Sequence, residues 1–119
     1  MLASVYDALF PYQRTGVRWM WELHQQRAGG IVGDEMGLGK TVQVAALLGA
    51  LHYSGALRRP SIVVAPATVL RQWVRELHTW APPLRVLLMH DSGGAMRRGY
   101  SRSQLIANLF RRGGVLLTT

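Results

Sequence analysis

The 119-residue chain contains no cysteine and a single lysine, Lys40, although it carries 13 arginines. The missing cysteine excludes disulfides, thiolate metal sites and thiol catalysis, and it fits a reducing compartment. No apolar run reaches the roughly 18 residues that cross a bilayer, since the longest extends from Val44 to Leu51. The N-terminus also lacks a basic region followed by an apolar one, so we expect no secretory signal and no membrane partner.

Acidic residues are scarce as well, six against 14 basic ones, which gives a net charge of +8. A basic balance favours polyanionic partners such as nucleic acid. Scattered arginine can equally reflect a coding bias, so charge alone leaves both interpretations open. After Glu76 the sequence contains one further acidic residue, Asp91.

The length of the chain predicts one small domain, and its 49% of hydrophobic residues is enough for a packed core. Apolar periodicity predicts helices at 12–26, 39–53, 68–80 and 101–112, and strands at 30–33, 61–65, 84–89 and 115–119. Strands that alternate with helices predict right-handed βαβ units and a parallel sheet, hence an α/β fold. Because the pattern ends on an apolar strand, we expect the chain to be part of a larger lobe.

The most informative segment is a glycine-rich turn between an apolar run and a helical pattern. Gly39, Lys40 and Thr41 match the end of the phosphate loop G-x-x-x-x-G-K-[ST], while Asp34 stands where the first glycine is usual. Gly37 and Gly39 can adopt backbone angles that aim successive N–H groups at phosphate oxygens. The helix that begins near Lys40 would add its positive end.

This turn predicts a site for a nucleoside triphosphate with Mg²⁺. Lys40, the catalytic candidate, would reach the β and γ phosphates, and the Thr41 hydroxyl would bind Mg²⁺. We expect Asp34 and Glu35 to make local hydrogen bonds or face solvent. The alternative is a glycine-rich turn with a surface lysine, but the strand–turn–helix context favours the nucleotide. The candidate binding loop comprises Asp34, Glu35, Met36, Gly37, Leu38, Gly39, Lys40 and Thr41.

Hydrolysis requires parts that the sequence does not supply. One carboxylate must hold Mg²⁺ and another must position water. The metal carboxylate normally ends a later apolar strand, but here only Thr118 and Thr119 follow the apolar residues 115–117. We therefore expect this chain to hold nucleotide without hydrolysing it on its own.

Four stretches together resemble the Snf2-type helicase-like ATPases. They are an adenine-reading segment at 9–13 and 16–19, motif I at 34–41, motif Ia at 64–70 with Gln72 and Trp73, and the strand of motif Ib at 114–119. Asp34 is the usual residue of that family. The finer match, at 16–24, 29–34, 76–80 and Pro82-Pro83, is to the Cockayne syndrome group B (Rad26-like) branch.

The resemblance, which covers the chain from about Leu9 onward, implies a partial RecA-like lobe. Residues 1–119 would form the N-terminal part of the ATP-binding lobe, truncated before the metal carboxylate. The whole motor would use ATP to translocate on double-stranded DNA and remodel protein–DNA complexes. The branch implies transcription-coupled repair in the nucleus, with chromatin or the transcription machinery as partners.

The resemblance also implies roles at matching positions. Gln13 would hydrogen-bond the adenine edge; the alternative is an exposed glutamine at a helix start. Thr68 and Arg71 would lie by the DNA backbone, although an N-cap and a solvated arginine explain them equally well. Thr118 matches a further backbone contact, with an edge-strand threonine as the alternative.

Two other functions stay open from the residues alone. A truncated, non-catalytic product would bind nucleotide or nucleic acid at most. A different P-loop enzyme, such as a kinase, would leave Tyr12-Gln13 and Ala65-Pro66 unexplained. The four tryptophans lie on amphipathic helices, so we interpret them as core residues rather than as platforms for base stacking.

Overall fold

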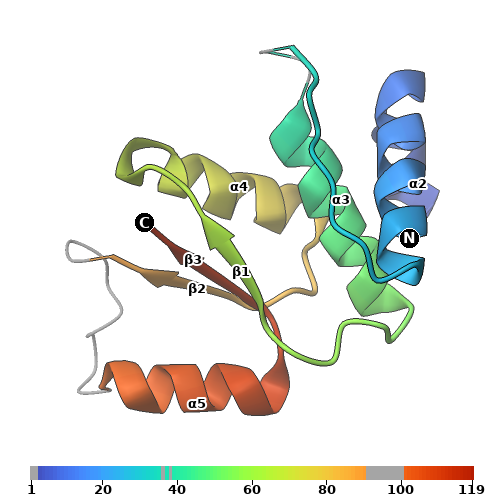
Figure 1. The fold of residues 1–119 in the computed structure, drawn as a ribbon. Helices are drawn as coiled ribbons and strands as arrows, with labels where there is room; N and C mark the ends of the chain where they lie inside the picture. Colours follow the sequence, from blue (N-terminus) through green and yellow to red (C-terminus); the bar gives the residue numbers. More distant parts are fainter. Residues whose placement is uncertain (1–2, 36, 38, 91–100) are drawn as a thin grey trace.

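The computed structural model describes residues 3–35, 37, 39–90 and 101–119. Two N-terminal helices precede the glycine-rich turn, and helices and strands alternate after it (Figure 1). The elements are α1 (Ala3–Ala8), α2 (Pro11–Gln25), α3 (Lys40–Tyr53), β1 (Ser61–Val64), the 3₁₀ turn η1 (Ala67–Val69), α4 (Leu70–Trp80), β2 (Val86–Met89), α5 (Arg102–Arg112) and β3 (Val115–Thr118).

The three strands form one parallel sheet in the order β1-β3-β2. The last strand of the chain is therefore central, and Leu117 pairs with Val63 on one side and with Leu88 on the other. Helices α4 and α5 lie on opposite sides of the strands (Figure 1). The parallel sheet between helices confirms the predicted α/β fold.

The main core lies between the sheet, α3 and α4. Val115 and Leu117 have no exposed surface, because alternate residues of β3 point at the same face of the sheet. Leu77 of α4 packs in the same cluster and is also fully buried. Trp73 and Trp80 are half-buried against this core, as predicted. Trp19 is 41% exposed on α2, so its assignment to the core was wrong.

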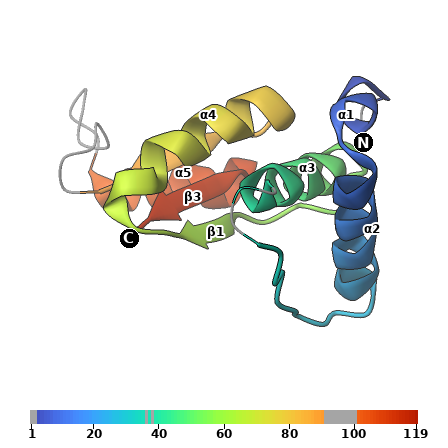
Figure 2. The ribbon, with the colours of Figure 1, turned by 90° about the horizontal axis from the view of Figure 1, so that it is seen from above.

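A second, smaller cluster attaches the N-terminal helices to α3. Leu9 and Val17 pack with Ala46 of α3, and Met20 and Leu47 lie around them. Viewed from above, α1 and α2 lie at one end of the molecule, away from the strands (Figure 2). The N-terminal helices are therefore positioned by α3 rather than by the sheet.

The strand predicted at 30–33 is absent, and residues 28–35 form no helix or strand. Gly30 instead lies against α2, where a Cβ on it would be 2.6 Å from Leu23 and 3.0 Å from Trp19. Ile31 is 88% exposed. An apolar strand needs a neighbour for its backbone hydrogen bonds, and neither β1 nor β2 pairs with this segment.

A side chain caps the start of α5 but not the start of α4. Ser101 caps α5, since its hydroxyl accepts a 3.1 Å bond from the Gln104 N–H and its own N–H donates to the Gln104 side chain. Thr68, predicted as the N-cap of α4, lies inside η1, and α4 begins at Leu70 without a side-chain cap. No helix in the described part of the chain is long and apolar enough to span a membrane.

Candidate nucleotide-binding site

The glycine-rich turn leads directly into the N-terminus of α3. Gly37 and Gly39 have φ angles of 85° and 80°, in the left-handed region that glycine tolerates and other residues avoid. Gly39 is the N-cap, and the first hydrogen bond of the helix runs from the Gln43 N–H to its carbonyl at 3.1 Å. Among the described residues no side chain caps the earlier N–H groups, which is the arrangement that binds an anion.

Lys40 is the first residue of α3 and is half-buried. Its Nζ donates a hydrogen bond to the backbone carbonyl of Asp34, which holds the ammonium over the turn. An ammonium has three donors, so this bond leaves capacity for phosphate oxygens. Thr41, also half-buried, follows in the first helical turn. The loop thus combines a cation, a hydroxyl and the positive end of a helix.

Asp34 is held through its side chain as well as through its carbonyl. Its Oδ2 accepts a 2.9 Å hydrogen bond from Nε2 of Gln43, a residue with no exposed surface. The expected local hydrogen bonding of Asp34 is therefore confirmed. Sequence reasoning missed Gln43, although it is the single polar residue in the apolar stretch from Val42 to Leu51. A lone polar residue in a buried stretch is the signal that could have found it.

Gln13 lies beside the same turn. It is only 6% exposed, so the alternative of an exposed helix-start glutamine is wrong. Its Oε1 accepts a 2.9 Å hydrogen bond from the Phe10 N–H, which caps the start of α2. A Cβ on Gly39 would lie 2.5 Å from its Nε2. The structure thus brings Gln13 together with Gly39, the N-cap of α3.

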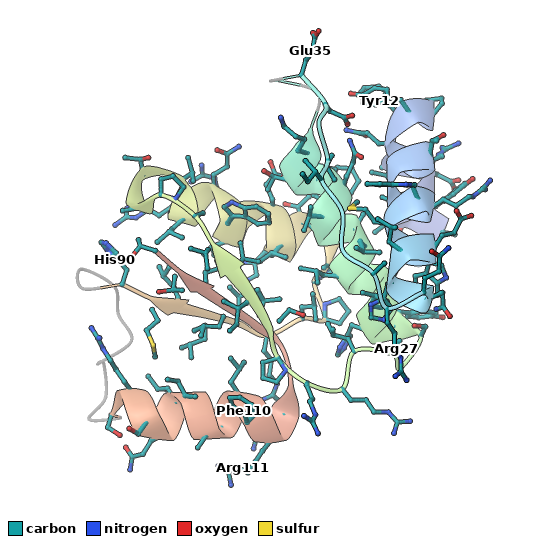
Figure 3. All side chains as sticks on the ribbon, in the orientation of Figure 1. Tyr12, Arg27, Glu35, His90, Phe110 and Arg111 are labelled. Atoms are coloured by element: carbon teal, nitrogen blue, oxygen red, sulfur yellow. The ribbon has the colours of Figure 1, made fainter. Side chains whose placement is uncertain are left out.

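The remaining candidates of the loop lie elsewhere. Glu35 is exposed and points away from α3 at the outer end of the segment (Figure 3). Met36 and Leu38 lie outside the described residues. In the ranges that the structure describes, no three His, Asp or Glu side chains gather closely enough to hold a metal ion.

The three predicted DNA contacts lie at the carboxyl-terminal edge of the sheet. Thr118 ends β3, and its carbonyl accepts a 3.0 Å bond from the Ala65 N–H just past β1. Thr68 in η1 and Arg71 in the first turn of α4 follow β1 directly, and both are exposed. The carboxyl-terminal ends of parallel strands meet at one edge, so these three residues share that edge.

A cavity of about 240 Å³ near α1 is a competing location for a ligand. Arg14 closes part of it, with its guanidinium 4.4 Å from the centre of the Tyr6 ring and its Nε donating to the Tyr6 carbonyl. No described residue of the glycine-rich turn lines this cavity, so we place the candidate site at the turn. The lining residues are Tyr6, Arg14, Val17, Arg18, Trp21 and Ala50.

A parallel α/β sheet, a left-handed glycine turn and a lysine at the start of the next helix together define the P-loop class. Comparison with known proteins narrows this class. The family model of the SNF2-related domain matches residues 12–119. The chain belongs to the SNF2-related family.

Its curated relatives place it near one branch of that family. It is 47% identical to DNA excision repair protein ERCC-6 of Mus musculus, over 97% of this chain and 8% of the relative. It is 57% identical to DNA excision repair protein CSB of Oryza sativa subsp. japonica, over 84% of this chain and 8% of the relative. The DNA repair and recombination protein RAD26 of Saccharomyces cerevisiae is 54% identical over 78% of this chain and 9% of its own length.

A solved structure is similar in both fold and sequence. The Sulfolobus solfataricus SWI2/SNF2 ATPase core, determined in complex with double-stranded DNA, superposes with a TM-score of 0.72 at 31% identity. The match covers 93% of this chain and 21% of that one. The predicted family and branch are confirmed, and the chain spans less than a tenth of the length of the three curated relatives.

Proposed function

We propose that this chain is the ATP-binding portion of a Snf2-type motor that translocates on double-stranded DNA. The observation that carries the proposal is the pair of left-handed glycines before the uncapped start of α3, with Lys40 as its first residue. Oriented N–H groups, a helix end and an ammonium attract the same ligand, a chain of phosphates. The ATPase core that it resembles supports the use of ATP.

The roles within the site follow from where the side chains lie. Lys40 would bind the β and γ phosphates. Gln13, buried against Gly39, would offer its amide to the adenine edge. The Thr41 hydroxyl would be one ligand of Mg²⁺, with phosphate oxygens and water as the others, because Mg²⁺ at nucleotides usually keeps few protein ligands.

We also propose that these 119 residues hold ATP without hydrolysing it. Asp34 is engaged by Gln43, and Glu35 is exposed and points outward, so neither is placed to position a water molecule. Hydrolysis would then depend on carboxylates other than these two.

Thr68, Arg71 and Thr118 are proposed to contact the phosphate backbone of DNA. Their common edge of the sheet, the exposure of Arg71 and the net charge of +8 support this proposal. We also propose a role in transcription-coupled repair, in the nucleus and alongside chromatin or the transcription machinery. The relatives that are named as DNA repair proteins support the repair part of this proposal.

Titration with ATP in the presence of Mg²⁺ tests the nucleotide site. We expect Lys40→Ala to weaken ATP binding roughly tenfold or more, because a charge-assisted hydrogen bond contributes about 1.5–3 kcal/mol. Arg58→Ala is the matched control, since it removes the same charge from an exposed residue of the loop that follows the opposite end of α3. Unchanged ATP affinity in Lys40→Ala would contradict the role of Lys40, and equal affinity for ATP and GTP would contradict that of Gln13.

A further inference from the structure

At the interface between α2 and α3, each helix extends one glutamine side chain toward a glycine of the other. Gln13 of α2 places its Nε2 where a Cβ on Gly39 would lie, at 2.5 Å. Gln43 of α3 places its Oε1 where a Cβ on Gly16 would lie, at 2.0 Å. Residues three or four apart share a helix face, so the two glutamine–glycine pairs occupy successive turns. Each glycine leaves the space that the opposite amide fills.

The chemistry of Asp34 fixes the orientation of the Gln43 amide. A carboxylate only accepts hydrogen bonds, so the NH₂ group must face Asp34, to which it donates at 2.9 Å. The carbonyl then faces α2, and within the described residues its Oε1 is buried without a hydrogen-bond partner. Turning the amide over would set two oxygens against each other. Gln43 therefore tolerates an unsatisfied acceptor in order to hold Asp34.

Asp34 is in turn the residue that anchors the start of the phosphate loop. Gln43 binds its carboxylate and Lys40 binds its carbonyl, so two residues of the same helix fix both its side chain and its backbone. The glycines that follow have little conformational preference of their own. The geometry of the loop thus depends on how firmly Asp34 is held.

We infer that Gln43 is a positioning residue of the nucleotide site, which acts through Asp34, and that Gly16 is the opening in α2 that admits it. The inference rests on the proposed binding of ATP. It predicts that the position of the phosphate loop relative to α2 depends on the contacts from Gly16 to Gln43 and from Gln43 to Asp34. A residue larger than glycine at position 16 would displace Gln43 and release Asp34.

The test compares ATP with adenosine as probes of the full 119-residue chain, by calorimetric titration. Gln43→Leu removes the amide at similar volume, so we expect ATP affinity to fall roughly tenfold while adenosine affinity stays unchanged. Gln72→Leu, an exposed glutamine on α4, is the control. A purely structural role would weaken both ligands alike, and an unchanged ratio of the two affinities in Gln43→Leu would overturn the inference.

Two further variants show whether Gln43 acts through Asp34. Asp34→Asn keeps an accepting oxygen and should retain most ATP affinity, whereas Asp34→Leu should lose as much as Gln43→Leu. The double variant Asp34→Leu/Gln43→Leu should lose no more than either alone, and additive losses would contradict the inference. If the unsubstituted chain binds ATP no better than adenosine, the proposed function itself is wrong.

Gly16 provides a readout that needs no nucleotide. Alanine in place of an interior helix glycine normally stabilises a protein. Gly16→Ala should instead lower the melting temperature, and the same change in a Gln43→Ala background should raise it. Gly29→Ala, with no atom within 4 Å of its added carbon, is the steric control. A rise in melting temperature for Gly16→Ala alone would show that the position of Gln43 does not depend on the absence of a side chain at position 16.

Discussion

The sheet and the α2–α3 interface are two regions of one small molecule that are held together differently. Around the sheet, Leu77, Val115 and Leu117 are fully buried among other apolar side chains. Between α2 and α3, the buried side chains include two glutamines, Gln13 and Gln43. Apolar packing has no preferred direction, whereas an amide requires a particular partner at a particular angle. Stability therefore resides mainly in the first region, and the geometry of the candidate site in the second.

The largest effect on stability should come from breaking the apolar region. Leu77→Ala removes a side chain with no exposed surface, and we expect it to lower the free energy of unfolding by about 3 kcal/mol. Chemical denaturation measures this loss. Leu57→Ala, at a half-buried position beside the same core, should cost less than half as much. Equal losses would show that the core near α4 is not closely packed.

An intermediate effect should come from the turn that joins the two regions. Gly39→Ala places a methyl group 2.5 Å from the Gln13 amide at a φ of 80°, so we expect it to cost about 1–2 kcal/mol and to weaken ATP binding. Gly37→Ala has a φ of 85° but no neighbour within 4 Å, so it isolates the backbone strain from the overlap. If both variants bind ATP as tightly as the unsubstituted chain, the turn does not form the phosphate site.

The smallest effect should come from the exposed edge of the sheet. Arg71→Ala removes one proposed phosphate contact, so binding to double-stranded DNA should weaken less than tenfold and the slope of log K against log salt should fall by about 1. Fluorescence anisotropy at several salt concentrations measures both quantities. Arg58 precedes β1 and so lies toward the amino-terminal ends of the strands. Arg58→Ala should therefore leave the slope unchanged. Equal slopes for both variants would remove Arg71 from the proposed DNA contacts.

Local pattern in the sequence predicted most of the elements. The helix predicted at 39–53 runs from Lys40 to Tyr53, and the strand predicted at 115–119 from Val115 to Thr118. The prediction of a strand at 30–33 was wrong because a strand depends on a partner that is often distant in sequence, and Gly30 contacts α2 instead. Apolar character alone could not distinguish these two outcomes.

The candidate site likewise contains residues that the sequence predicted and one that it did not. Gly37, Gly39, Lys40 and Thr41 were predictable because the motif is contiguous and its chemistry is local. Gln43 was not, since its partners are Asp34 and Gly16, nine and 27 positions before it in the sequence. Contacts between residues so far apart become visible only once α2 and α3 are placed side by side.

The central claim is that the turn before α3 binds a chain of phosphates, and the affinity of the unsubstituted chain for ATP relative to adenosine tests it most directly. Both ligands carry the same base and sugar, so a difference between them reports on the phosphates. We predict that ATP binds at least about tenfold more tightly than adenosine when Mg²⁺ is present, as expected for one or more charge-assisted hydrogen bonds. Equal dissociation constants for the two ligands would contradict the claim.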